Sequence, residues 1–179
     1  MMKPFEIFLT SRFANILSMI ALSTLIAIDM NVVQAENWPG WRGPRGDGTS
    51  LESSAPTQWD ATTGEGLAWK VDVPGWGHSS PIVWEDRIFV VSCIEDTNER
   101  ILVCFDRRDG HVLWQRTVLK SILEKKHKLN SFASGTPVTD GQTVYVSFLE
   151  SDGTEIPAKN VGEPRMIKRG TMVLSLIHI

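Results

Sequence analysis

Short runs of apolar residues, separated by turn residues, follow one another along the chain from Leu67 onwards. The first run (LAWKVDV) alternates apolar and polar positions, as a half-buried strand does. Only residues 119–129 (LKSILEKKHKL) favour a helical turn or two, and they lie between two sets of β runs as an insertion. The predicted strands are residues 67–73, 80–84, 87–93, 101–105 and 111–117. This pattern predicts an all-β protein.

The connections between the predicted strands are short and contain turn residues. Glu85-Asp86 is a two-residue hairpin connection, and residues 106–110 close the next hairpin, where Gly110 is able to adopt a positive φ. The middle strands are apolar at nearly every position instead of at every other one. Because that pattern is typical of sheets covered on both faces, we expect these sheets to be stacked between neighbours.

Comparison of the chain with itself reveals a repeated segment. Residues 79–90 align without gaps on residues 135–146, at an offset of 56 residues, so that Pro81 corresponds to Pro137. A fixed offset between similar segments is typical of stacked supersecondary units.

A second correspondence carries a tryptophan. Residues 67–71 align on residues 112–116 at an offset of 45, which pairs Trp69 with Trp114. The insertion at 119–129 explains why the two offsets differ. Units of this length, with four antiparallel strands each and a tryptophan that closes each outer strand, are typical of β-propeller blades.

Residues 104–114 (CFDRRDGHVLW) resemble the repeat motif Ala-x-Asp-x-x-Thr-Gly-x-x-x-Trp of the pyrroloquinoline-quinone-like (PQQ-like) β-propellers. Cys104 stands where the motif has alanine, and Asp109 stands where it has threonine. Three positions match it, namely Asp106, Gly110 and Trp114. Residues 38–44 and 134–141 are also similar to exported bacterial members of that family.

The resemblance covers residues 37–148 and implies a partial, incomplete β-propeller of the quinoprotein alcohol dehydrogenase-like type. Propellers typically close with four to eight blades, and this chain holds about two, so we expect an N-terminal fragment. The structural positions of the repeat are Trp69, Pro81, Cys104, Asp106, Gly110, Trp114 and Pro137. Tryptophan offers wide apolar area and one N–H donor, and Asp106 is placed to accept turn amides.

The resemblance raises two functions. The first is a non-catalytic scaffold that binds a protein or polymer, and the alternative is an oxidoreductase that uses pyrroloquinoline quinone and calcium, with a site largely outside this fragment. The chain lacks adjacent cysteines and an evident calcium-binding cluster, so we assign no catalytic, cofactor or metal residue. Carbohydrate binding at the propeller face is a third possibility. His78, next to the Ser79-Ser80-Pro81 segment, faces the central channel in one interpretation and is structural in the other.

Four segments are expected along the chain. Residues 1–35 are predicted to be a cleaved signal peptide, because a basic start precedes a short apolar run and Val33-Gln34-Ala35. A lead-in loop follows over 36–66, in which Trp38 and Trp41 are expected to pack on the fold. The blades occupy 67–171. Residues 172–179 depart from the repeat, and we interpret them as a foreign or frame-shifted tail on a truncated sequence. Export to the periplasm or medium is expected, without a transmembrane or lipid anchor.

Charge and cysteines add two further expectations. The net charge is −3, which gives no basic excess to bind the phosphates of nucleic acid. Cys93 and Cys104 fall opposite each other if the chain turns at Asn98-Glu99, and they stay two buried thiols if the turn is displaced.

Overall fold

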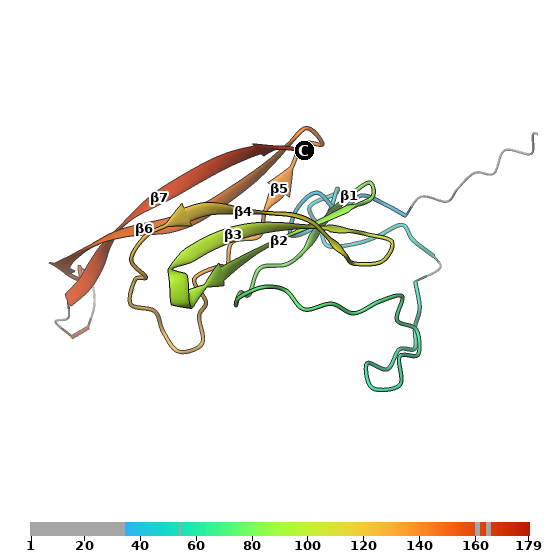
Figure 1. Ribbon diagram of the computed structural model, residues 1–179, viewed down its shortest axis with the longest axis horizontal. Helices are drawn as coiled ribbons and strands as arrows, with labels where there is room; N and C mark the ends of the chain where they lie inside the picture. Colours follow the sequence, from blue (N-terminus) through green and yellow to red (C-terminus); the bar gives the residue numbers. More distant parts are fainter. Residues whose placement is uncertain (1–34, 54, 160–161, 164–165) are drawn as a thin grey trace, which may run out of the picture. The chain divides into compact units, whose positions relative to one another are not determined.

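The computed structural model describes residues 35–53, 55–159, 162–163 and 166–179, so the predicted signal peptide, residues 1–35, lies outside the described residues except for Ala35. The described chain forms two antiparallel sheets (Figure 1). Sheet A has the order β1-β2-β3-β4, and sheet B has the order β5-β6-β7. The strands are β1 (Ile82–Trp84), β2 (Arg87–Ile94), β3 (Glu99–Asp106), β4 (Val112–Lys120), β5 (Val138–Thr139), β6 (Thr143–Pro157) and β7 (Met166–His178). The all-β prediction is confirmed, and the two open antiparallel sheets, of four and three strands, are consistent with the predicted incomplete propeller.

β3 is the centre of sheet A and is buried on both faces, as its continuous apolar run predicts. Every residue from Arg100 to Asp106 is buried. One face contributes Leu102 and Cys104 to a core that also contains Val146 and Phe148 of sheet B. The other face carries a second cluster around Ile101, Val103 and Phe105. Sheet A is therefore covered on both sides, which explains why its middle strands do not alternate.

The two sheets begin with hairpins of the same register. Ile82 pairs with Phe89 in sheet A, and Val138 pairs with Tyr145 in sheet B. Each residue of the second pair lies 56 positions after its counterpart, which is the offset of the repeat. The hairpin residue Glu85 has a φ of 51°, and its counterpart Gly141 has a φ of 92°. The repeat in the sequence is thus a repeat of the backbone.

The lead-in segment bonds to both hairpins at equivalent positions. Trp38 and Val83 of β1 exchange two backbone hydrogen bonds of 2.8 and 2.9 Å, and the carbonyl of Pro39 accepts the amide of Thr139 in β5 at 2.9 Å. Trp38 is partly buried, as expected. The expectation for Trp41 is wrong, because 64% of this residue is exposed. The backbone of residues 38–39, and not a pair of indoles, joins the lead-in to the sheets.

The strand predicted over residues 67–73 is not formed. The alternation of apolar and polar positions does correspond to a face of this segment. Its apolar residues Trp69, Val71 and Val73 line one cavity together with Val90 and Phe105 of sheet A. A strand also needs a neighbour that accepts and donates ladder hydrogen bonds. No described strand pairs with this segment, so it crosses the face of sheet A as an extended connection.

The helical turns predicted over residues 119–129 are likewise absent. β4 continues to Lys120, and Ile122 forms an isolated bridge with Ser151 of β6. The Ser121 carbonyl accepts a hydrogen bond from the Arg100 guanidinium at 2.7 Å. Because tertiary partners engage this segment, its backbone stays extended instead of bonding to itself every fourth residue.

The turn between β2 and β3 is displaced from its predicted position, which decides the state of the cysteines. A 3-10 turn, Glu95–Thr97, ends at Asn98 with a φ of 60°. In the resulting register Cys93 lies opposite Arg100, and Cys104 lies opposite Phe89. Both cysteines are free and buried, so of the two alternatives the pair of buried thiols is present.

The predicted tail is part of β7. Thr143 of β6 pairs with His178, and the pairing continues through Leu149 opposite Met172. Ile177 is buried in the core shared with sheet A. The side chains on the opposite face of β7 remain open, with Met172, Leu174 and Leu176 between 60% and 76% exposed. The predicted segment boundaries and the foreign origin of the tail stay predictions. Among the described residues, no helix is long and apolar enough to cross a membrane.

Candidate binding site

The repeat motif builds a rigid hairpin between β3 and β4. The buried carboxylate of Asp106 accepts the Arg108 amide at 2.8 Å and the Arg108 guanidinium at 3.0 and 2.6 Å. These bonds hold the pKa of Asp106 well below its usual range, and the bonds from the Arg108 side chain have the largest effect. Gly110 has a φ of 76°, and its amide donates to the Asp106 carbonyl at 2.9 Å. Asp106 and Gly110 therefore each have a structural role that depends on the residue type.

The two motif tryptophans pack in different places. The Trp69 indole covers Gly110, and its Nε1 donates to the Arg107 carbonyl at 2.9 Å. Trp114 of β4 is partly buried against the core, 5.9 Å from the Phe89 ring between centroids. Cys104 is buried in the same core. Trp69 thus fixes the segment before sheet A onto the motif hairpin, and Trp114 fixes the outer strand.

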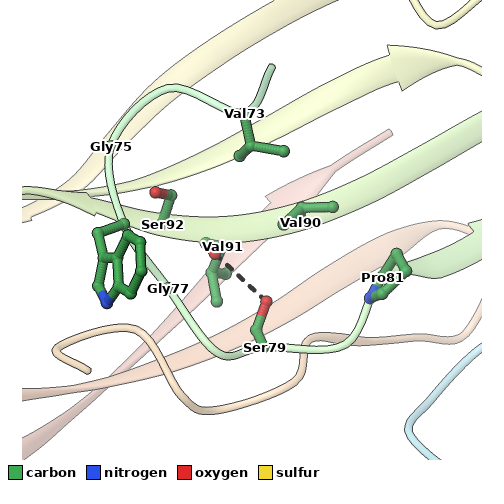
Figure 2. A pocket seen from close by; sticks show the side chains of 9 residues that line it. Val73, Gly75, Gly77, Ser79, Pro81, Val90, Val91 and Ser92 are labelled. Atoms are coloured by element: carbon green, nitrogen blue, oxygen red, sulfur yellow. Dashed lines mark hydrogen bonds between the residues drawn. The ribbon is translucent and has the colours of Figure 1, made fainter. Parts of the chain in front are cut away.

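The remaining motif residues, Pro81 and Pro137, each precede the first strand of a sheet. Pro137 is fully buried, whereas Pro81 is exposed at the edge of a groove. The groove has a volume of about 320 Å³ and lies beside β2 (Figure 2). The motif residues therefore lie in three places. Trp69, Asp106 and Gly110 lie at the β3–β4 hairpin. Cys104, Trp114 and Pro137 pack in or against the core, and Pro81 lies at this groove.

The groove exists because the chain before β1 leaves β2 partway along its length. Trp76 exchanges two backbone hydrogen bonds with Cys93, of 2.8 and 2.9 Å. The amides of His78 and Ser79 instead donate to the carbonyl of Ala133, in the segment before β5, at 3.0 and 3.1 Å. Residues 77–80 are thus drawn toward the second repeat, and a gap opens beside Val91.

Two serine hydroxyls lie in this gap. The Ser79 hydroxyl donates to the Val91 carbonyl at 3.2 Å, the bond drawn in Figure 2. Ser92 is only 1% exposed, and its Oγ has no hydrogen-bond partner. A buried hydroxyl left without a partner costs about 1–3 kcal/mol. In Figure 2, Ser92 and Val90 rise from the same side of β2 toward Val73. Ser92 is therefore a buried polar group of the lining with unused bonding capacity.

An exposed indole completes the groove. Trp76 is 59% exposed although its backbone is fixed to Cys93. Its ring meets the His78 ring edge-on, with 6.0 Å between centroids and 63° between planes. His78 thus contacts this tryptophan, and the structure leaves its channel-facing interpretation untested. Sequence reasoning missed Trp76 and Ser92, although a tryptophan between two glycines, Gly75 and Gly77, was a usable signal.

The groove does not have the residues of a quinone or metal site. Its lining contains no charged side chain, whereas pyrroloquinoline quinone carries carboxylates and calcium needs several oxygen ligands. The three ligand atoms of Asp106, Asp109 and His111 lie within 4.8 Å of one another. There the Arg108 guanidinium already neutralises Asp106. Neither the groove nor this cluster therefore fits that cofactor.

A buried arginine in β3, opposite Cys93 of β2, joins the two sheets. Arg100 of β3 is 0% exposed and forms an ion pair with Glu124 at 2.9 Å. It also donates to the carbonyls of Ser121 and Leu149, the latter in β6 at 3.3 Å. A charged residue within an apolar strand was the available signal for this cross-link.

Comparison with known proteins gives one match. A protein-family model described as Outer membrane protein assembly factor BamB matches residues 52–163. That range is more than half of the chain and contains β1 to β6 together with the groove. No curated protein and no solved structure matches the chain significantly.

Proposed function

Because the chain belongs to the PQQ-repeat family described as Outer membrane protein assembly factor BamB, we propose that it is a non-catalytic binding scaffold that acts outside the cytoplasm. Its partner is a protein or a polymer of the cell envelope. The stacked sheets supply a rigid frame, and the connections before β1 and β5 supply the recognition surface. Function in such folds depends on loops carried by the frame and not on the frame itself.

One observation carries this proposal, namely the chemistry of the groove lining. General acid–base catalysis needs a titratable side chain within hydrogen-bond reach of the substrate, and the lining has none. A nucleophilic serine needs a neighbouring base. The Ser79 hydroxyl donates to a backbone carbonyl, and the His78 ring contacts Trp76 instead. The groove is thus suited to holding a ligand and not to moving protons.

The alternative is a PQQ- and calcium-dependent oxidoreductase, which the repeat type favours and the groove chemistry does not. The purified chain is incubated with pyrroloquinoline quinone and Ca²⁺, passed through gel filtration and assayed for dye reduction with alcohols. A scaffold is expected to lose the quinone absorbance on the column. Quinone retained together with alcohol-dependent dye reduction would overturn the scaffold proposal.

The scaffold itself is tested by co-sedimentation with insoluble cell-envelope material. We expect saturable binding that bovine serum albumin, as a control protein, does not show. Export is tested separately by fractionating cells that express the full chain and sequencing the N-terminus of the exported form, which is expected to begin at Glu36. Absence of saturable binding, or a chain confined to the cytoplasm, would contradict the proposal.

A further inference from the structure

Sheet B has one strand fewer than sheet A, and its edge strand is unprotected. In the order β5-β6-β7, the outer edge of β7 pairs with no described strand. An edge strand presents unpaired N–H and C=O groups to which another strand can bond, and charged residues or proline commonly block it. Residues 171–177 of β7 (TMVLSLI) contain neither. The place that β4 takes in sheet A is therefore open in sheet B.

The chain also contains a strand-like segment that belongs to no sheet. Residues 67–73 alternate apolar and polar positions, but no described strand pairs with them. In the described part of the chain, no backbone group of residues 68–73 is hydrogen-bonded to another backbone group. Residues 67–71 correspond in the repeat to residues 112–116 of β4. The segment is thus the counterpart of the strand that sheet B lacks.

This segment cannot complete sheet B of its own chain. Its apolar side chains line a cavity together with Val90 and Phe105, on one face of sheet A. The opposite face of sheet A carries Leu102 and Cys104 and packs on sheet B. Sheet A therefore lies between residues 67–73 and the free edge of β7, so the missing strand has to come from another molecule.

The strand pairing of sheet A fixes the register that a fourth strand would have in sheet B. Trp114 of β4 lies opposite Cys104 of β3, which in turn lies opposite Phe89 of β2. Tyr145 of β6 is 56 residues after Phe89 and lies opposite Leu176 of β7. Leu176 is therefore the counterpart of Cys104, and the residue expected opposite it is a tryptophan.

Trp69, the repeat counterpart of Trp114, meets this requirement when it comes from a second copy of the chain. With Trp69 opposite Leu176, antiparallel pairing places Val71 opposite Leu174. The two leucines are 60% and 62% exposed, and Val71 is 38% exposed. Both cross-strand pairs are apolar, so their contact buries apolar surface and no charge.

We propose that residues 67–73 of one copy of this chain add to the free edge of β7 in a second copy, as the fourth strand of its sheet B. The addition gives ladder hydrogen bonds to backbone groups of both segments. It also brings the open face of sheet B, with Leu174 and Leu176, toward the side of sheet A that carries Val90 and Phe105. The contact repeats between copies the packing of sheets A and B within one chain.

The proposed contact is heterologous, because the edge of β7 and residues 67–73 are different surfaces. Heterologous contacts generate a ring if the rotation closes and a filament if it does not. Each copy brings two sheets. Propellers close with typically four to eight blades, so a closed ring contains about two to four copies.

The first test is the mass of the purified full chain, measured by light scattering after gel filtration over a range of concentrations. We expect an assembly of about two to four copies. Leu174→Lys and Val71→Lys are each expected to yield the monomer, because each places a charge in the apolar contact. Leu51→Lys is the matched control, since Leu51 is 81% exposed and lies in the lead-in segment, and it should leave the mass unchanged.

Thermal unfolding of each variant shows whether it is folded. Larger assemblies that both charge substitutions dissociate also support the contact, as a filament would form through the same surfaces. A wild-type chain that stays monomeric at every concentration overturns the proposal. An assembly that neither substitution affects overturns it too, because another surface would then hold the copies together.

The second test is a disulfide between copies. The proposed register places Lys70 opposite Ser175, so Lys70→Cys in a tagged copy should cross-link to Ser175→Cys in an untagged copy on mild oxidation. Thr171→Cys is the matched control for Ser175→Cys, because it lies four residues, roughly 13 Å, farther along β7. That distance exceeds the reach of a disulfide, about 7 Å between Cα atoms, so no cross-link is expected.

The cross-links also distinguish the other possible occupants of the edge. A disulfide between two copies of the single variant Ser175→Cys would show that β7 pairs with β7 of its neighbour, which overturns the proposal. In a chain that carries both Lys70→Cys and Ser175→Cys, a cross-link within the single chain would overturn it as well.

The assembly and the scaffold function fail separately. A monomer that still binds envelope material overturns the assembly and leaves the scaffold intact. An assembly that binds no envelope material overturns the scaffold and leaves the contact between copies intact.

Discussion

The indole of Trp69 lies directly against the Cα of Gly110, so close that a Cβ at this glycine would fall 2.5 Å from the ring. The same indole donates from Nε1 to the Arg107 carbonyl in the same hairpin. The tryptophan that precedes sheet A is therefore fastened onto the β3–β4 turn by one apolar and one polar contact. Two residues of the repeat motif, 41 positions apart in the chain, form one contact.

Gly110→Ala is predicted to destabilise the protein for two reasons. Its φ of 76° is unfavourable for alanine, at about 1–2 kcal/mol, and the new Cβ displaces Trp69. Gly46→Ala is the matched control, because Gly46 has a φ of 71° and nothing within 4 Å of the added Cβ. In urea unfolding, Gly110→Ala should lose about 1–3 kcal/mol more than the control. Equal losses would show that the packing of Trp69 is unimportant.

Trp114→Ala is predicted to lower the free energy of unfolding by about 3 kcal/mol, the lower end of the range for such truncations. The lower end applies because Trp114 is only partly buried, packed beside Phe89 and the core between the sheets. Trp41→Ala, which truncates an indole that is 64% exposed, should change stability by less than about 0.5 kcal/mol. Thermal and chemical unfolding measure both variants, and unchanged stability of Trp114→Ala would refute a structural role.

Glu124→Gln is predicted to destabilise the protein by about 3 kcal/mol, because it leaves the fully buried Arg100 without its counter-charge. Adding Arg100→Met to this variant removes that charge and should recover part of the loss. Glu99→Gln, which breaks the 3.4 Å pair with the exposed Lys120 side chain, should cost less than about 1 kcal/mol. A double variant less stable than Glu124→Gln alone would show that the carbonyl bonds of Arg100 matter more than its charge balance.

Cys93 and Cys104 are predicted to be reduced and unreactive in the native protein. Burial raises the pKa of Cys104 to about 11 and raises that of Cys93 as well. A thiol reagent at pH 8 should label neither residue until denaturant is added, and then label both. Because the folded state holds these protons more tightly than the unfolded state, stability is expected to fall as the pH rises above about 9. Intact mass that shows a disulfide would contradict the prediction.

The hairpins were predictable because their signals are local. The two-residue connection Glu85-Asp86 and the turn glycine Gly110 stand where the structure turns, and the repeat offset appears unchanged in the strand pairing. The segment 67–73 shows the limit of such signals. Its alternation correctly predicts which side chains face sheet A, but a strand also depends on a partner elsewhere in the chain.

The candidate groove was less predictable than the fold. A tryptophan between glycines marked the place, but the gap itself arises because the amides of His78 and Ser79 bond to Ala133, more than fifty residues away. The state of the cysteines had a local origin instead, since a small displacement of the turn at Asn98 moved Cys93 opposite Arg100.

The amino-acid sequence alone determined that this protein is built from repeated antiparallel β units, because side-chain alternation and turn residues act between near neighbours. The tertiary structure decided which connections stay unpaired, which thiols stay free and where Ser92 lies without a partner. The unpaired connections and the groove depend on hydrogen bonds between residues far apart in the chain, which are fixed only when the two sheets pack together. The state of the thiols depends on where the turn before β3 falls.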